Sequence, residues 1–119
     1  MISGLGSRQF YLCVEPTDMR KSFNGLSGLV TNELGQEVGL GDAFIFINKR
    51  RDKIKILVWD FSGYVIYYKQ LERGTFELPI HNKSDKKLTI DRSELMLIME
   101  GIQLKSIRRR KRYSSGKAS

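Results

Sequence analysis

The sequence predicts an α+β domain built on one antiparallel sheet, and three observations support this prediction. A segment with helical periodicity, residues 18–34, separates a short strand-like segment from three further strand-like segments. Those three are joined by connections of a few residues, which are typical of hairpins and too short for a parallel crossover. A second helical segment follows near residue 92. We expect a meander of three to five strands, one face covered by the helix from the N-terminal half, and a short C-terminal helix.

The first strand and the first helix are predicted from two different periodicities. In residues 9–15 apolar side chains alternate with others, as in a strand. In residues 18–34 apolar side chains recur every three or four positions and mark one helix face. These are Met19, Phe23, Leu26, Val30 and Leu34. We expect Thr17 or Asp18 to cap the start of this helix, because both carry a side-chain oxygen that can accept a free backbone N–H.

The meander is predicted from residues 43–48, 53–60 and 64–71, which are rich in β-branched and aromatic side chains. The connection between the first two of these strands contains three consecutive cations, Lys49, Arg50 and Arg51. We therefore expect the tip of this hairpin to display three positive charges in solvent.

The C-terminal part of the domain is predicted to contain a loop, a short strand and a helix. Residues 72–87 are polar and irregular, and Leu88 to Ile90 can add a brief strand. Asp91 and Glu94 have the spacing of a capping box, which predicts a helix from Arg92 to Glu100.

Length and composition exclude several classes of protein. The chain has 119 residues, 40% of them hydrophobic, which fits one domain. No apolar run approaches the roughly 18–20 residues that cross a bilayer, and the first residues do not resemble a signal peptide. A single cysteine, Cys13, and a single histidine, His81, exclude an internal disulfide and Cys- or His-rich metal sites. We expect a cytoplasmic protein without membrane contact, metal or cofactor.

Positive charge is concentrated at the C-terminus. The net charge is +8, and residues 105–119 carry seven basic side chains and no acidic one. The run Arg108–Arg112 repels itself, so we expect a single domain over residues 1–104 and a basic flexible tail over 105–119. Such a tail can bind phosphates through counterion release, or it can serve only as a solvated, solubilising segment. Its charge alone fits DNA, RNA or an acidic protein surface.

Two further cationic groups extend the candidate DNA-binding surface. Arg20 and Lys21 are expected in the first helical turn, beside a helix N-terminus that suits phosphate; the alternative is ordinary solvated helix surface. Lys53 extends the cationic hairpin tip. The candidate DNA-binding residues are Arg20, Lys21, Lys49, Arg50, Arg51, Lys53, Arg108, Arg109, Arg110, Lys111 and Arg112.

The sequence contains no recognisable set of catalytic residues. A two-metal nuclease needs several converging carboxylates, and the candidates Asp18, Asp42, Asp52 and Asp60 are dispersed along the chain. We therefore predict a non-enzymatic protein without catalytic residues, and keep a metal-dependent nuclease as an alternative.

Aromatic side chains gather in the last two strands of the meander and in the adjoining turns. They are Trp59, Phe61, Tyr64, Tyr67, Tyr68 and Phe76. We expect most of them to fill the core. The alternative is an exposed platform on which unpaired bases stack beside basic side chains.

Residues 16–26, PTDMRKSFNGL, resemble the PTDMRKGFDGL signature of the TnpB accessory proteins of IS-sixty-six-type insertion sequences. Ser22 and Asn24 depart from that signature. The similarity continues through residues 44–52 and 68–79 and covers about residues 10–104. The resemblance implies an auxiliary protein encoded beside a DDE-type transposase in a bacterial mobile element, with no catalytic residues assigned to it.

Two hypotheses about function follow. The first is a factor that binds DNA or assembles the transposase complex, with the cationic residues on phosphates. The second is a protein adaptor that docks on the transposase, or on the other accessory protein of the same element, through the aromatic strands without touching DNA.

Overall fold

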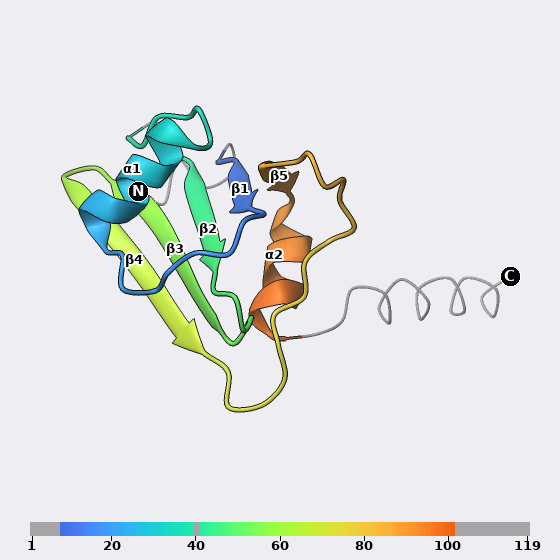
Figure 1. Cartoon of the computed structure of the whole chain (residues 1–119). Helices are drawn as coiled ribbons and strands as arrows, with labels where there is room; N and C mark the ends of the chain where they lie inside the picture. The colour runs from blue at the N-terminus through green and yellow to red at the C-terminus, as the bar shows by residue number, and fades with distance from the viewer. Residues whose placement is uncertain (1–7, 40, 102–119) are drawn as a thin grey trace, which may run out of the picture.

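The computed structural model describes residues 8–39 and 41–101. The predicted basic tail, with Arg108–Arg112, lies outside these residues. Seven elements follow in chain order (Figure 1): β1 (Phe10–Cys13), α1 (Phe23–Asn32), β2 (Ala43–Ile47), β3 (Lys53–Asp60), β4 (Gly63–Gln70), β5 (Lys87–Ile90) and α2 (Arg92–Met99). All five predicted strands and both predicted helices are present.

The strands form one sheet in the order β4-β3-β2-β1-β5. The α+β class is confirmed, and the sheet is mostly antiparallel, as in the β3–β4 hairpin. The sheet is not entirely antiparallel, because β1 and β2 pair in parallel, with Leu12 opposite Ile45. The expectation of a wholly antiparallel sheet was wrong at this point. The chain between β1 and β2 includes α1, so it is long enough for a parallel crossover.

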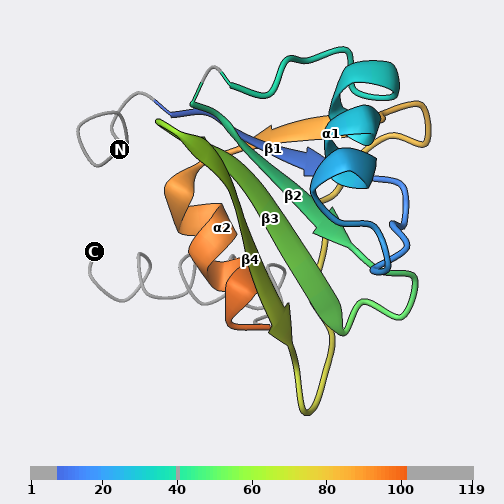
Figure 2. The same ribbon diagram turned by 90° about the vertical axis from the view of Figure 1, so that its left-hand side faces the viewer.

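Helices cover both faces of the sheet, whereas one covered face was expected. Figure 2 shows α1 and α2 on opposite sides of the strands. The sequence of β2 accounts for this arrangement, because all five of its residues are buried. Phe44 and Phe46 point to the α1 side, and Ala43, Ile45 and Ile47 point to the α2 side. A strand buried on both faces is apolar throughout rather than alternating.

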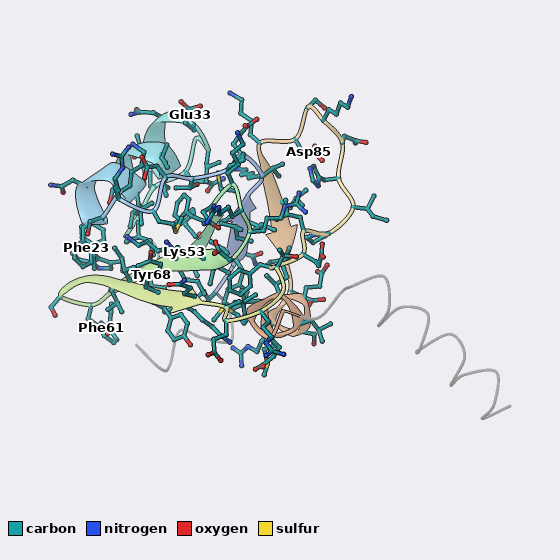
Figure 3. The ribbon with its side chains drawn as sticks, turned by 60° about the horizontal axis from the view of Figure 1, so that its bottom comes forward. Phe23, Glu33, Lys53, Phe61, Tyr68 and Asp85 are labelled. Atoms are coloured by element: carbon teal, nitrogen blue, oxygen red, sulfur yellow. The ribbon has the colours of Figure 1, made fainter. Side chains whose placement is uncertain are left out.

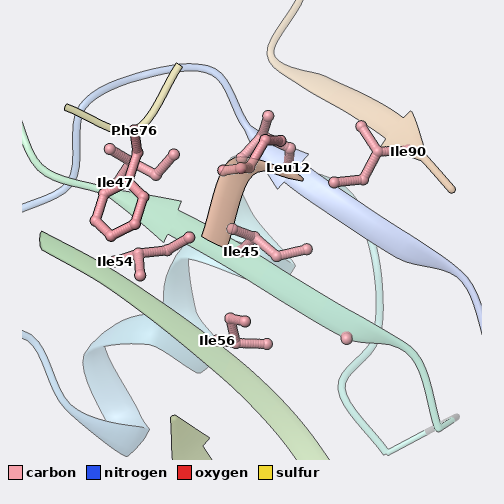
Figure 4. Packing of buried hydrophobic residues seen from close by; sticks show 9 residues of the cluster. Leu12, Ile45, Ile47, Ile54, Ile56, Phe76 and Ile90 are labelled. Carbon is pink, nitrogen blue, oxygen red and sulfur yellow. The ribbon is translucent and has the colours of Figure 1, made fainter. Parts of the chain in front are cut away.

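Two apolar clusters therefore hold the domain together. On the α1 side, Leu26 and Val30 of the helix pack with Phe44, Phe46 and Leu57. On the α2 side, Figure 4 shows a layer formed by the strands and by Phe76 from the loop after β4. Its labelled members are Leu12, Ile45, Ile47, Ile54, Ile56, Phe76 and Ile90. Full burial of such a side chain contributes roughly 1.5–3 kcal/mol.

Helix α1 begins later than the sequence predicts. Its N-cap is Ser22, whose side chain makes no capping hydrogen bond. The backbone N–H of Thr17 donates to the carbonyl of Ile47 (2.9 Å), and the Asp18 carboxylate accepts from the N–H of Arg20 (2.9 Å). These bonds fix residues 17–22 as an ordered loop. Arg20 and Lys21 consequently precede the helix and do not lie in its first turn.

Helix α2 begins as the sequence predicts. The Asp91 carboxylate accepts from the N–H of Glu94 (2.7 Å), and the Glu94 carboxylate accepts from the N–H of Asp91 (3.2 Å). This capping box satisfies two backbone donors at once. Within the described part of the chain, neither helix has the length and apolar character that a membrane crossing requires.

The capping box gives a prediction about stability. Asp91→Ala removes the acceptor for the Glu94 N–H and should lower the free energy of unfolding by about 1 kcal/mol, measured by urea denaturation. Ser93→Ala, in the same exposed turn, is the control and should change stability little. Equal losses in the two variants would contradict the capping role.

Candidate nucleic-acid interface

The cationic hairpin tip between β2 and β3 is fixed by hydrogen bonds from within. The side-chain oxygen of Asn48 accepts from the N–H groups of Asp52 and Lys53 (both 3.0 Å). The Asn48 amide donates to the Asp52 carboxylate (2.7 Å), and this bond lowers the pKa of that carboxyl. Arg51 has a left-handed backbone (φ 62°) and its N–H closes the turn on the Asn48 carbonyl. As predicted, the tip exposes Lys49, Arg50 and Arg51.

A buried lysine holds the loop of residues 17–22 against the same end of the sheet. Lys55 is the third residue of β3, and the residue is only 7% exposed. Its ammonium donates to the carbonyls of Met19 and Lys21 (both 2.8 Å) and lies 4.6 Å from the centre of the Tyr68 ring. A buried cation is costly without such partners. The two bonds therefore fix where the loop, and Arg20 within it, can lie.

The loop and the hairpin tip meet around an open pocket of about 580 Å³. We call it the basic pocket, because its lining carries four cations. The lining residues are Pro16, Thr17, Asp18, Met19, Arg20, Asn48, Lys49, Arg50, Lys53 and Tyr68. Figure 3 shows Lys53 and Tyr68 close together on the neighbouring strands β3 and β4. The fold thus joins Arg20 to three cations that lie about thirty positions later in the chain.

One cation of the basic pocket is paired within the pocket itself. The Arg20 guanidinium donates to the Asp18 carboxylate at 2.7 Å, although its side chain is 92% exposed. Hydrogen bonds from Arg20 lower the pKa of Asp18 to about 2. An exposed pair of this kind adds little to stability. Its effect is local, since at neutral pH it offsets one of the four positive charges.

Two of the predicted site residues that the structure describes, Lys21 and Arg51, lie outside the basic pocket. Lys21 is exposed, and its side-chain stem packs beside Gly25, where an added Cβ would come within 3.1 Å of it. Gly25 therefore leaves room for the Lys21 side chain. Arg51 is turned toward the loop after β4, where its guanidinium lies 3.8 Å from the Glu77 carboxylate.

Sequence reasoning missed Tyr68, Asn48 and Lys55 as parts of the site. The signal for Lys55 is its position, because it lies between Ile54 and Ile56, in the mostly apolar interior of the strand. A lysine there needs carbonyl or carboxylate partners from another segment.

The expectation that most of the late aromatic side chains fill the core was wrong. Phe76 is fully buried, but Phe61, Tyr64, Tyr67 and Tyr68 are 73%, 39%, 53% and 51% exposed. The reason is the position of β4, which is the outermost strand. Among these four rings, Tyr64 has two aromatic neighbours in the described part of the chain, Trp59 at 4.9 Å and Phe23 at 6.3 Å between ring centres.

The dispersed carboxylates have separate structural partners. Asp42 accepts from the N–H of Gln9 (3.1 Å). Asp18 accepts from the Arg20 guanidinium, and Asp52 accepts from the Asn48 amide. In residues 8–39 and 41–101, no three acidic, histidine or cysteine side chains gather as a metal site.

The Asp18–Arg20 pair gives a prediction about pH. Because the pKa of Asp18 in the folded chain is about 2, below the ordinary 3.8, the pair persists above pH 4 and is lost as the pH falls toward 2. Arg20→Ala should raise this pKa toward 3.8, as measured by NMR titration of the carboxyl carbon. Lys21→Ala is the control and should move it much less. Equal shifts would contradict the assignment.

Lys55 gives a prediction about stability and loop order. Lys55→Met keeps the apolar stem but leaves the carbonyls of Met19 and Lys21 without their donor, so the free energy of unfolding should fall by about 2 kcal/mol. Amide hydrogen exchange should accelerate in residues 17–22. Lys53→Met, on the same side of β3 but at the pocket surface, is the control and should leave both measurements nearly unchanged. Unaltered exchange in Lys55→Met would contradict the anchoring role.

Comparison with known proteins identifies the family. The family model described as IS66 Orf2 like protein matches residues 8–109. The chain is also 31% identical over 110 residues to the uncharacterized protein y4jC of Sinorhizobium fredii, and the match covers 92% of each chain. No solved structure matches. These findings confirm the resemblance seen in residues 16–26, and the chain belongs to the IS66 Orf2-like family of insertion-sequence accessory proteins.

Proposed function

We propose that this accessory protein binds DNA through backbone phosphates in the basic pocket and thereby helps to assemble the transposase complex. The observation that carries the proposal is the convergence of Arg20 with Lys49, Arg50 and Lys53 around one open pocket. Residues Arg108–Arg112 supply a second set of cations for the same polyanion.

The composition of the basic pocket suits a phosphate backbone better than a small ligand. Lys49, Arg50 and Lys53 lie at or near the surface, where each can neutralise a phosphate and release condensed counterions. The volume of about 580 Å³ is open to solvent and accommodates a run of backbone rather than one enclosed group. Contacts of this type position a protein on DNA without reading its sequence. We therefore expect binding with little sequence preference.

A second candidate function, a protein adaptor for the transposase, is favoured by the exposed side chains of Val65 and Tyr67 on β4. This role predicts that the transposase is retained in a pull-down after nuclease treatment. The DNA-bridged role predicts that nuclease releases it.

The proposal is tested by the salt dependence of DNA affinity. If about five phosphate contacts form, log K should fall with log salt at a slope of about −4 to −5. Fluorescence anisotropy with a labelled duplex measures this slope. Replacing Lys49→Ala and Arg50→Ala together should make the slope shallower by about 2. The matched control, Lys83→Ala with Lys86→Ala, removes the same charge from the loop before β5 and should leave the slope near that of the unaltered chain.

A third variant should change the affinity in the opposite direction. Asp18→Asn removes the carboxylate that pairs with Arg20, so it should strengthen DNA binding. Identical slopes for the pocket and control variants, or a flat salt response of the unaltered chain, would contradict the proposal.

A further inference from the structure

The two edges of the sheet differ in how well they are protected. The two edge strands are β4 and β5, which lie at opposite ends of the sheet (Figure 1). Strand β5 has four residues, whereas β4 has eight. Proteins usually blunt an edge strand with charge, proline or a bulge, because its unpaired backbone groups recruit another strand. The sequence of β4, GYVIYYKQ, has no proline and one charged residue, Lys69. The ammonium of Lys69 is turned back to donate to the carbonyl of Met99 (2.7 Å).

Within residues 8–39 and 41–101, the exposed side chains of β4 form an apolar strip along this edge. Tyr64, Val65, Tyr67 and Tyr68 are each between 39% and 53% exposed. They lie on both sides of the sheet, as the β3–β4 register shows. Tyr68 is opposite Lys55 on the α1 side, and Tyr67 is opposite Ile56 on the α2 side. Covering this strip requires a partner that adds a strand and meets both sides of the sheet at once.

We propose that the partner is a second copy of this chain, paired through β4 in antiparallel fashion about Ile66. The sequence of the strand is self-complementary about this residue. On the α1 side, Tyr64 would face Tyr68 of the second copy, and Ile66 would face Ile66. On the α2 side, Val65 would face Tyr67. Aromatic pairs and aromatic–β-branched pairs are favourable across antiparallel strands.

The register and the residue that faces Lys69 both favour pairing about Ile66. Directly opposite residues of paired strands share a side of the sheet, so shifts by one residue are excluded. A shift by two residues, to pairing about Tyr67, would place Lys69 opposite Val65. Pairing about Ile66 places Lys69 opposite Gly63 instead, and brings no two cations together. Every second residue of β4 turns its backbone N–H and C=O away from β3, and these groups become the bonds of the new pair.

The pairing makes one ten-stranded sheet with a two-fold axis perpendicular to it. Such an axis keeps the α1 sides of both copies on one face. Since Lys53, Lys55 and Tyr68 all lie on the α1 side of their strands, the two basic pockets would open on that same face. The two Tyr68 residues would be four positions apart, or about 14 Å along the strands. The inference about pairing does not depend on DNA binding.

The test measures the mass of the full chain by light scattering after nuclease treatment, in about 0.5 M salt, which screens charge and weakens nucleic-acid bridging. The unaltered chain should have twice the chain mass of 13.7 kDa. Val65→Lys with Tyr67→Lys places lysine opposite lysine across the pair and should give a folded monomer, checked by circular dichroism. The control Met96→Lys, at an exposed position on α2, should remain a dimer.

A second variant makes the test specific for the register. Val65→Glu with Tyr67→Glu should also be monomeric alone. An equimolar mixture of the lysine and glutamate variants should recover the dimer mass, because each lysine then faces a glutamate. A monomeric unaltered chain, a mass that neither variant changes, or a mixture that stays monomeric would each overturn the proposal.

Discussion

The buried ammonium of Lys55 is the interaction on which the arrangement of the site depends. It joins three segments of the chain, because it lies on β3, binds the carbonyls of Met19 and Lys21, and contacts the Tyr68 ring on β4. Without these bonds the loop of residues 17–22 would be tied to the sheet chiefly through Thr17. A cation used in this way contributes little to the outer surface. Its role is to place other cations, which remain accessible.

The basic pocket combines a rigid scaffold with exposed charges. The hairpin tip is organised by Asn48, and the loop opposite it by Lys55, so neither segment needs to become ordered when a ligand arrives. Pre-ordering of this kind reduces the entropic cost of binding. In the proposed DNA complex, the Asp18 carboxylate would compete with phosphate for Arg20, because the two side chains are already paired. The affinity for DNA would then depend mainly on Lys49, Arg50 and Lys53.

Those parts of the fold that rest on local chemistry could be predicted from the sequence. The β3 strand agrees residue for residue, and the Asp91–Glu94 box correctly placed the start of α2. The start of α1 could not be predicted, because the backbone N–H of Thr17 donates to the carbonyl of Ile47, thirty positions away, and this long-range bond keeps Thr17 in the loop before the helix. The parallel pairing of β1 and β2 depends on the order of the strands in the sheet, and the alternation of apolar residues within each strand does not reveal that order. The cationic hairpin tip of the site could be predicted from the charges in the sequence. That Arg20 lies beside this tip could not be predicted, because the fold alone brings the two segments together.

The exposure of the β4 rings shows a different limit of sequence reasoning. A strand with aromatic side chains on both faces has the same pattern whether it lies at the centre of a sheet or at its edge. The position in the sheet decides between core and surface. Here the edge position leaves Tyr67 and Tyr68 exposed, and it is what makes pairing with a second copy possible.

The most direct test of the basic pocket as the DNA-binding surface is an NMR titration of the full chain with a short duplex. The amide signals of residues 17–21 and 48–53 should shift together and saturate at the same DNA concentration, while those of residues 82–87 stay in place. Shifts in only one of the two pocket segments, or shifts concentrated in residues 82–87, would contradict a joint phosphate site formed by the loop and the hairpin tip.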